Sequence, residues 1–267
     1  MDPIRTIACH FLCKNEASAS FFFAKTSSMV EPWRTGTVIR IKQETPGTRR
    51  FWIQISELEN FVFKPGQFIT LDLPIHEQRN KRWRSYSIAS WPDGSNIIEL
   101  VIVFLEGGLG TKYLFEEVKE GSELVLRGPQ GVFTLPEVLE KDLFLVCTGT
   151  GIAPFRSMVN FLRLHGLPHG DIHLIFGCRT EQDLLYYKEM SDLGEAMEGF
   201  YYHPTLSRET KPGFHQGYVH DRYEALCTDH QDALFFLCGW KPMIDEARER
   251  IAGMGYDRKA VHLELYG

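Results

Sequence analysis

The segment Leu143-Phe144-Leu145-Val146-Cys147-Thr148-Gly149-Thr150-Gly151-Ile152-Ala153-Pro154 decides the fold of the second half of this chain. Its apolar run predicts a buried strand, and its two glycines and proline predict a tight turn that opens directly into a helix. Such a turn presents backbone N–H groups and the positive end of a helix, which suit a phosphate. The glycine spacing differs from GxGxxG, so a dinucleotide-binding turn and an ordinary strand-to-helix connection both stay open here.

The residues after about Leu135 continue this alternation of apolar strand and helix. Strands are expected at residues 143–147, 172–176, 201–206, 233–237 and 261–265, with helices at residues 153–164, 181–192, 221–227 and 242–254. Near-continuous apolar strands joined by helices need cover on both faces of their sheet. We therefore predict a doubly wound parallel α/β domain over residues 139–267.

The first half of the chain has shorter strands with alternating apolar residues. They are expected at residues 37–41, 50–55, 67–71, 85–88, 97–103 and 123–126, with one helix at residues 111–118. Turns such as Lys64-Pro65-Gly66 separate them, and the pattern predicts a small antiparallel β-barrel over residues 29–138. Residues 1–28 fit neither domain; we expect a disordered leader, with an organelle-targeting peptide or a packed arm as alternatives.

Composition limits the classes of function. The 267 residues carry 29 Lys and Arg against 35 Asp and Glu, a net charge of −6, which argues against a nucleic-acid-binding or anionic-membrane surface. No apolar run reaches the ~18 residues that a membrane span needs. The six cysteines have no CxxC spacing, so we expect reduced thiols of a cytoplasmic protein and no metal site. We also expect a monomer.

Two further motifs carry groups suited to phosphates and planar rings. Arg84-Ser85-Tyr86-Ser87 combines a guanidinium, an aromatic ring and hydroxyls on alternating strand positions, although such a run is by itself typical of an ordinary barrel strand. Gly108-Leu109-Gly110-Thr111 precedes a helix and offers a second anion-binding N-terminus. One such site in each domain predicts two phosphorylated ligands.

The order of the motifs resembles the ferredoxin–NADP reductase family over residues 34–267. The matching features are Arg84-Ser85-Tyr86-Ser87, Gly108-Leu109-Gly110-Thr111 with Leu114, Gly128-Pro129-Gln130-Gly131-Val132-Phe133, Gly149-Thr150-Gly151-Ile152-Ala153-Pro154, Ser207-Arg208-Glu209, Cys238-Gly239 and His262-Leu263-Glu264-Leu265-Tyr266. The resemblance implies an FAD-binding barrel followed by an NADP-binding domain. It also implies hydride transfer between NADPH and flavin N5.

The resemblance assigns residues to both cofactors. It implies that Arg84 holds the FAD pyrophosphate, that Tyr86 stacks on the isoalloxazine and that Ser87 approaches N5. The other expected FAD ligands are Ser85, Gly108, Leu109, Gly110 and Thr111. The expected ligands of the nicotinamide dinucleotide are Thr148, Gly149, Thr150, Gly151, Pro154, Cys238 and Gly239, and the expected catalytic residues are Ser87, Cys238, Glu264 and Tyr266. The resemblance also implies that Tyr266 binds the flavin by covering the face where the nicotinamide must sit, although here Gly267 follows it.

Selectivity for NADP follows from the same resemblance. Ser207 and Arg208 match the family's pair for the 2′-phosphate, and Arg179 would supply a second cation. Tyr218 resembles the tyrosine that stacks on adenine in plant-type members, whereas Gln216 stands where those enzymes have a lysine. We predict a preference for NADP, because an NAD enzyme would more often place an acidic residue at the ribose.

The electron partner is expected to be a separate protein. The chain lacks the CxxxxCxxC pattern of a plant-type iron–sulfur cluster, so we expect a one-electron carrier, ferredoxin or flavodoxin, as the acceptor. The alternatives are a reductase component of an oxygenase or other multicomponent system, and a regulatory subunit without turnover. A basic patch for an acidic partner is expected from Arg79, Lys81, Arg82 and Arg84 with Arg49 and Arg50, unless residues 79–82 form an ordinary solvated loop.

Overall fold

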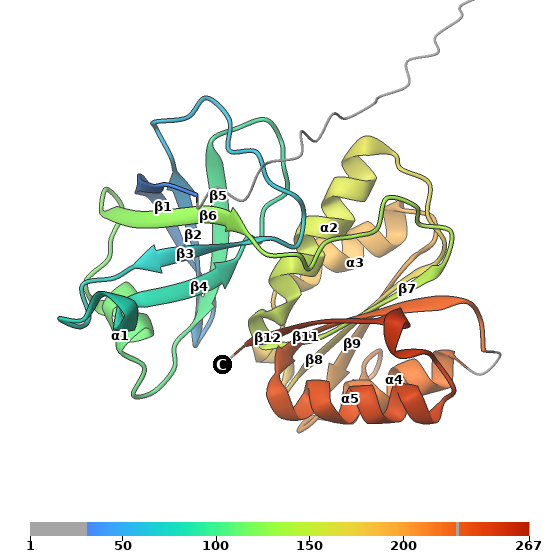
Figure 1. Ribbon diagram of the computed structural model, residues 1–267. Coiled ribbons are helices and arrows are strands. Elements are labelled where there is room, and N and C mark those ends of the chain that lie inside the picture. The colour runs from blue at the N-terminus through green and yellow to red at the C-terminus, as the bar shows by residue number, and fades with distance from the viewer. Residues whose placement is uncertain (1–30, 228–229, 267) are drawn as a thin grey trace, which may run out of the picture. The chain divides into compact units, whose positions relative to one another are not determined.

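The computed structural model describes residues 31–227 and 230–266 of the chain, and from Glu31 onward they belong to one compact unit (Figure 1). The expectation for a leader at residues 1–28 lies outside the described residues. In the part of the chain that is described, no helix has the length and apolar character needed to cross a membrane.

The first domain is a six-stranded antiparallel sheet with the order β4-β3-β6-β1-β2-β5. Its members are β1 (Trp33–Thr45), β2 (Thr48–Gln54), β3 (Phe68–Asp72), β4 (Trp83–Ser87), β5 (Ile97–Val103) and β6 (Glu123–Gln130). Just beyond β4, Ala89 N–H donates to the Glu99 carbonyl of β5 at 2.8 Å, which joins the two outer strands into the expected barrel. Side chains such as Phe51, Ile69 and Leu126 fill the interior.

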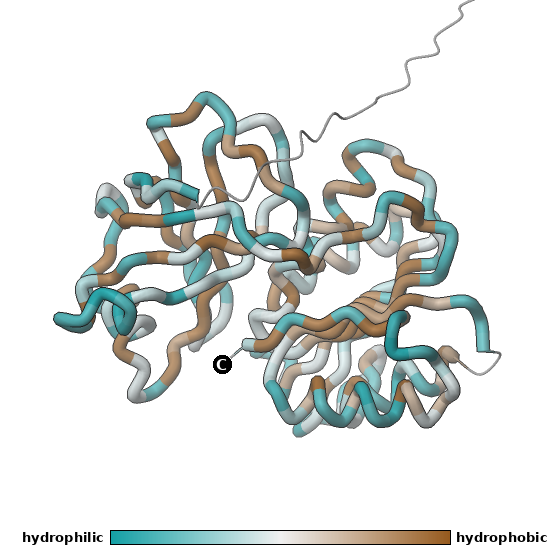
Figure 2. The backbone as a smooth tube through the Cα atoms, in the orientation of Figure 1, coloured by the Kyte–Doolittle hydropathy of each residue, from teal (hydrophilic) through white to brown (hydrophobic). Residues whose placement is uncertain are grey.

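The second domain is a six-stranded parallel sheet with the order β10-β9-β8-β7-β11-β12. Its strands are β7 (Asp142–Thr148), β8 (Ile172–Cys178), β9 (Phe200–Leu206), β10 (His215–Gln216), β11 (Ala233–Trp240) and β12 (Val261–Tyr266). Figure 2 shows these strands as a band of hydrophobic residues, as expected for a sheet that is buried on both faces.

Helices cover both faces of the parallel sheet. The helices are α2 (Ile152–His165), α3 (Tyr187–Ala196), α4 (Val219–Leu226) and α5 (Lys241–Gly253). Phe155 of α2 and Met190 of α3 pack in one core, whereas Tyr223 of α4 and Ile244 of α5 pack in another, so the two pairs lie on opposite faces (Figure 1). The predicted doubly wound α/β fold is confirmed.

Several local predictions differ from the structure. The helix expected at residues 181–192 is a short 3₁₀ turn, Glu181–Asp183, followed by α3 from Tyr187. The Thr180 and Asp183 side chains cap that turn reciprocally, and Tyr186 breaks the helical path with a left-handed φ of 53°. The barrel helix α1 (Leu109–Glu116) begins two residues before the expected start. The short strand β10 was not predicted.

Candidate active site

The carboxyl end of the parallel sheet meets strand β4 of the barrel through three side chains. The Ser87 hydroxyl, at the end of β4, donates to Glu264 Oε2 at 2.8 Å and accepts from the Tyr266 hydroxyl at 2.7 Å. Cys238 of β11 lies opposite Glu264 in the parallel register, and its thiol is near enough to the Tyr266 hydroxyl that each group shifts the pKa of the other. The structure therefore brings all four expected catalytic residues together.

Burial favours the neutral forms of the acidic groups in this cluster. Burial raises the pKa of Glu264, and the hydrogen bond from Ser87 offsets part of this effect. The Cys238 thiol is fully buried, and burial together with the nearby Glu264 carboxylate raises its pKa well above its ordinary value. Such a thiol is a poor nucleophile, so the site is suited to holding a reactant in place rather than to covalent catalysis.

The motif Arg84-Ser85-Tyr86-Ser87 forms most of β4. The Arg84 guanidinium donates to the carbonyls of Lys81 at 3.1 Å and Trp83 at 2.7 Å, which fixes its position. Tyr86 packs partly against the barrel core, and burial raises its pKa to about 12. Ser85 shares a hydrogen bond of 3.1 Å with Thr70 of β3, a partner that sequence reasoning missed.

The start of α1 lies against Arg84. A Cβ added at Gly110 would stand 2.9 Å from Arg84 Cγ, so the absence of a side chain at residue 110 makes room for the arginine. Thr111 Oγ1 accepts from Leu105 N–H at 3.1 Å and lies 3.1 Å from the Gly108 carbonyl, so this hydroxyl also closes the loop before the helix. Leu109 is exposed. The expected phosphate-binding residues of the first domain thus lie together.

The turn between β7 and α2 packs closely against β11 and is open on its other side. A Cβ at Gly151 would lie 2.3 Å from the Cys238 carbonyl oxygen, whereas one at Gly149 would meet nothing within 4 Å. Thr148 Oγ1 is buried and has no hydrogen-bond partner among the described residues, and it lies 2.5 Å from the Cβ position of Gly239. A buried hydroxyl without a partner, beside an open glycine turn, suits a polar ligand.

Two cations gather where β8 and β9 end. The backbone N–H of Arg208 donates to the backbone carbonyl of Arg179 at 2.9 Å. The backbone N–H of Ser207 likewise donates to the carbonyl of Cys178 at 3.0 Å. Both arginine side chains are exposed, and within residues 31–227 and 230–266 neither guanidinium forms a hydrogen bond or ion pair. The exposed Tyr218 follows β10, which pairs with β9 beside them. This edge is suited to a phosphate and a flat ring.

The predicted basic patch is wrong for Arg50. Its Nε donates to the buried Glu99 at 2.6 Å, and its NH1 lies 3.2 Å from Glu44, so it is largely hidden and neutralised. Arg79 and Arg82 share one carboxylate, Asp72, at 3.5 and 2.8 Å. Alternating strand positions do not reveal which arginines face buried acids, which explains the error.

Two cavities flank β12. One of about 280 Å³ is lined by Phe68, Gly131, Val132, Phe133, His262, Leu263 and Glu264, so it reaches the predicted active site through Glu264. The other, about 420 Å³, runs along α5 and contacts none of the predicted site residues. The larger of these two cavities is therefore not the one that reaches the predicted active site.

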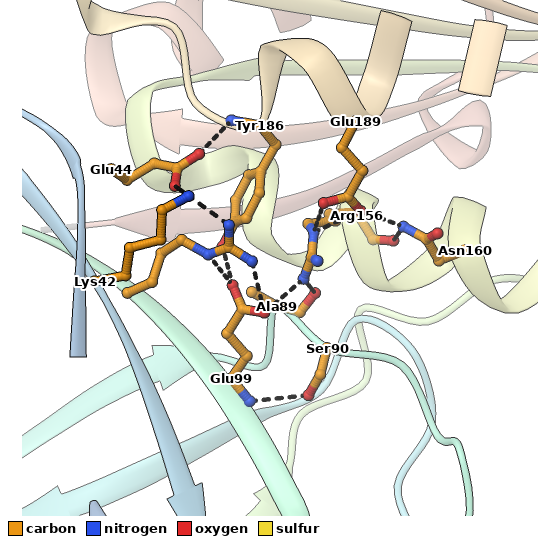
Figure 3. Close-up of polar contacts among 10 residues, drawn as sticks. Lys42, Glu44, Ala89, Ser90, Glu99, Arg156, Asn160, Tyr186 and Glu189 are labelled. Carbon is orange, nitrogen blue, oxygen red and sulfur yellow. Dashed lines mark hydrogen bonds and ion pairs between the residues drawn. The ribbon is translucent and has the colours of Figure 1, made fainter. Parts of the chain in front are cut away.

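A buried polar network also crosses between the domains, and nothing in the sequence pointed to it. Figure 3 shows Glu99 of the barrel close to Arg156 and Tyr186 of the second domain, with Glu44 and Glu189 at its two ends. The residues are scattered among ordinary strands and helices. No motif or spacing links them, so the three-dimensional fold is needed to bring them together.

Comparison with known proteins identifies the two domains. The oxidoreductase FAD-binding domain model matches residues 35–135, and the oxidoreductase NAD-binding domain model matches residues 145–249. Ferredoxin–NADP reductase B of Sorangium cellulosum is 33% identical over 238 residues, which cover 86% of this chain and 96% of that protein. The chain belongs to the ferredoxin–NADP reductase family.

Another curated relative and a solved structure are also similar to this chain. The anthranilate 1,2-dioxygenase electron transfer component of Acinetobacter baylyi is 30% identical, over 91% of this chain and 71% of that protein. A ferredoxin NADP⁺ reductase from Neisseria gonorrhoeae, solved with bound FAD and NADP, superposes with a TM-score of 0.74 and 25% identity over 87% of this chain and 98% of that one. The family, the oxidoreductase class and the FAD- and NAD-binding domains predicted from the sequence are confirmed.

Proposed function

We propose that this protein is an FAD-dependent reductase that exchanges electrons between NADPH and a separate one-electron carrier, ferredoxin or flavodoxin. The observation that carries the proposal is the hydrogen-bonded group of Ser87, Glu264 and Tyr266, which joins the FAD-binding barrel to the carboxyl edge of the NAD-binding sheet. Open α/β sheets bind their ligands at that edge.

The residues of the barrel fit a flavin dinucleotide. Arg84 would hold the pyrophosphate, together with the N–H groups at the start of α1, because its guanidinium is already fixed against Gly110. Tyr86 and Ser87 would contact the ring system from β4. The remaining ligands of the flavin in this proposal are Ser85, Gly108, Leu109 and Thr111.

The second domain fits a nicotinamide dinucleotide with a 2′-phosphate. The buried Thr148 hydroxyl, which lacks a partner among the residues described, and the open Gly149 support the placement of the dinucleotide at the turn formed by residues 148–154. Arg179 and Arg208 would bind the 2′-phosphate with Ser207, and Tyr218 would stack on the adenine. Cys238 and Gly239 would border the nicotinamide.

When bound, the flavin supplies the redox chemistry, since it takes two electrons from a nicotinamide and releases them singly. The chain's own residues then position and shield the reactants. Tyr266 would cover one face of the flavin and has to move aside before the nicotinamide can take that place. Ser87 and Glu264 orient polar atoms at the junction, and Glu264 can hold a proton there because burial favours its neutral form.

Anaerobic stopped-flow reduction of the purified flavoprotein tests this function. NADPH should bleach the flavin faster than NADH, and a ferredoxin or flavodoxin added afterwards should reoxidise it. A flavin that neither nucleotide reduces would exclude the proposal. Gel filtration in the same buffer tests the proposed monomer, and cell fractionation tests its proposed place in the cytoplasm.

A reductase component of an oxygenase system is the second candidate. The similarity to the anthranilate 1,2-dioxygenase electron transfer component supports it. The acceptor distinguishes the two functions: reduced protein that passes electrons to an oxygenase component, but to neither ferredoxin nor flavodoxin, would establish this second candidate.

A further inference from the structure

The barrel carboxylate Glu99 is the centre of the network that spans the two domains. It is 3% exposed and accepts from Arg50 of its own domain at 2.6 Å, from Arg156 NH1 at 3.1 Å and from the Tyr186 hydroxyl at 2.7 Å (Figure 3). Arg156 and Tyr186 both belong to the NAD-binding domain. One buried carboxylate is therefore shared between the domains.

Arg156 holds three separate partners with one guanidinium. Its NH1 donates to the Ala89 carbonyl at 2.8 Å as well as to Glu99, and its Nε donates to Glu189 of α3 at 2.8 Å. The side chain is 5% exposed. The planar guanidinium directs its N–H groups at fixed angles, which the single ammonium of lysine cannot reproduce.

Tyr186 reinforces the same contact. The guanidinium carbons of Arg50 and Arg156 lie 4.6 and 4.4 Å from the centre of its ring, and its backbone N–H donates to Glu44 at 3.1 Å. Tyr186 also has the left-handed φ of 53°, a conformation that a tyrosine keeps only when surrounding contacts impose it. The network therefore constrains the backbone as well as the side chains.

The position of Arg156 along the chain gives the network its significance. Ala89 lies two residues after Ser87 of the proposed flavin-binding strand, and Arg156 lies two residues after Pro154 of the proposed dinucleotide-binding turn. The 2.8 Å bond between Arg156 and the Ala89 carbonyl thus links the two binding motifs by a very short path. Buried ion pairs contribute little net stability compared with apolar packing, but their directional bonds define geometry.

We propose that Arg156 is a positioning residue for hydride transfer: through Glu99 and the Ala89 carbonyl it fixes the dinucleotide-binding turn relative to the flavin-binding strand. This inference rests on the proposed function. Hydride transfer needs donor and acceptor atoms in close contact, and a misplacement of about 1 Å can cost about a hundredfold in rate. Arg156 touches neither reacting atom in this proposal.

Arg156→Lys tests the inference, with Arg250→Lys as a matched control. Arg250 also pairs with several carboxylates, but its partners Asp221, Glu224 and Glu246 all lie within its own domain. In flavin-replete Arg156→Lys, we expect the limiting rate of flavin reduction by NADPH to fall by about tenfold or more. The NADP⁺ dissociation constant, measured by titration, should change by less than about twofold, because the binding groups remain. Arg250→Lys should match the wild type.

Hydrogen–deuterium exchange provides a readout that is independent of turnover. Arg156→Lys should speed amide exchange by about tenfold at residues 88–90 and at the start of α2, because both segments lose their shared anchor. A folded variant with wild-type rate and exchange would overturn the inference. A variant that loses flavin or melts earlier, yet keeps the wild-type rate per bound flavin, would also overturn it and leave a purely structural role.

Glu99→Gln decides the question if Arg156→Lys does not fold. Glutamine keeps the size of glutamate and an acceptor oxygen but weakens the bonds from Arg156 and Tyr186, so the same loss of limiting rate is expected and an unchanged rate overturns the inference. Wild-type protein whose flavin no nucleotide reduces would instead refute the proposed function, and the positioning role with it. The two failures are therefore distinguishable.

Discussion

The Tyr266 hydroxyl donates a hydrogen bond of 2.7 Å to Ser87 Oγ, which ties the outermost strand of the NAD-binding sheet to the last residue of a barrel strand. In the proposed function the tyrosine ring must leave this position before the nicotinamide can bind. The hydrogen bond therefore adds to the cost of opening the site.

Tyr266→Phe should make that opening easier. The substitution keeps the ring and removes the hydrogen bond, which is worth about 0.5–1.5 kcal/mol, so we expect NADPH to bind about two- to tenfold more tightly. Titration of the oxidised flavin with NADP⁺, which must displace the same ring without reducing the flavin, measures the affinity. Tyr256→Phe is the matched control, since the Tyr256 hydroxyl donates to the Gln231 carbonyl at 3.1 Å, away from the proposed site. Unchanged affinity in Tyr266→Phe would contradict this role.

Arg208→Ala should weaken the use of NADPH and spare that of NADH. A charge-assisted contact with phosphate contributes about 1.5–3 kcal/mol, so kcat/KM for NADPH should fall about 10- to 100-fold. Steady-state kinetics with both nucleotides measure the effect. Arg248→Ala, at an exposed arginine of α5, should change neither value. Equal losses with NADPH and NADH would show that Arg208 does not bind the 2′-phosphate.

Glu264→Gln should become more stable relative to the wild type as the pH rises. Burial raises the pKa of Glu264 in the folded state above its ordinary value of 4.5, so the folded state binds the proton more tightly than the unfolded chain does. The wild type therefore loses stability as the pH rises from about 4.5 through the raised pKa, and a glutamine avoids that loss.

Urea unfolding of wild type and Glu264→Gln at several pH values between about 4 and 7 measures this difference. The glutamine side chain can still accept a hydrogen bond from Ser87, so both proteins keep this bond and differ only in the charge that Glu264 can carry. Glu198→Gln, at an exposed carboxylate after α3, is the control. A stability difference that stays constant with pH would mean that Glu264 is not desolvated in the folded protein.

Gly151→Ala should destabilise the fold, because its Cβ would lie 2.3 Å from the Cys238 carbonyl oxygen, a backbone atom that cannot rotate away. We expect a loss of about 1–3 kcal/mol. Gly253→Ala is the matched control: Gly253 ends α5, its Cβ would meet nothing within 4 Å, and a gain of about 0.5–1 kcal/mol is expected. Denaturant unfolding measures the stability of both variants. An unchanged stability of Gly151→Ala would show that the turn after β7 can move away from β11 at no cost in free energy.

Local sequence patterns predicted both domains and most of their elements, because burial on one or both faces of a sheet leaves a clear apolar periodicity. They also marked the turn at Gly149–Gly151 and the strand that carries Arg84. The break at Tyr186 was missed, since its left-handed backbone is imposed by contacts with Glu44 and Glu99 from another domain. The wrong prediction for Arg50 has a different origin: its partners Glu44 and Glu99 lie on other strands of its own barrel, and the sequence does not show which charges pair once the strands assemble.

The charges around Glu99 have a consequence for building hybrid reductases. A barrel exchanged into another family member without a matching arginine would bury Glu99 with one cation fewer, and the reverse exchange would leave Arg156 without its barrel carboxylate. Removing one partner of a buried ion pair costs up to about 3–5 kcal/mol, of which the remaining partners, Arg50 for Glu99 and Glu189 for Arg156, would offset a part. One domain of this protein can therefore be exchanged without that cost only when the new partner domain supplies the matching residue, an arginine for Glu99 or a carboxylate for Arg156.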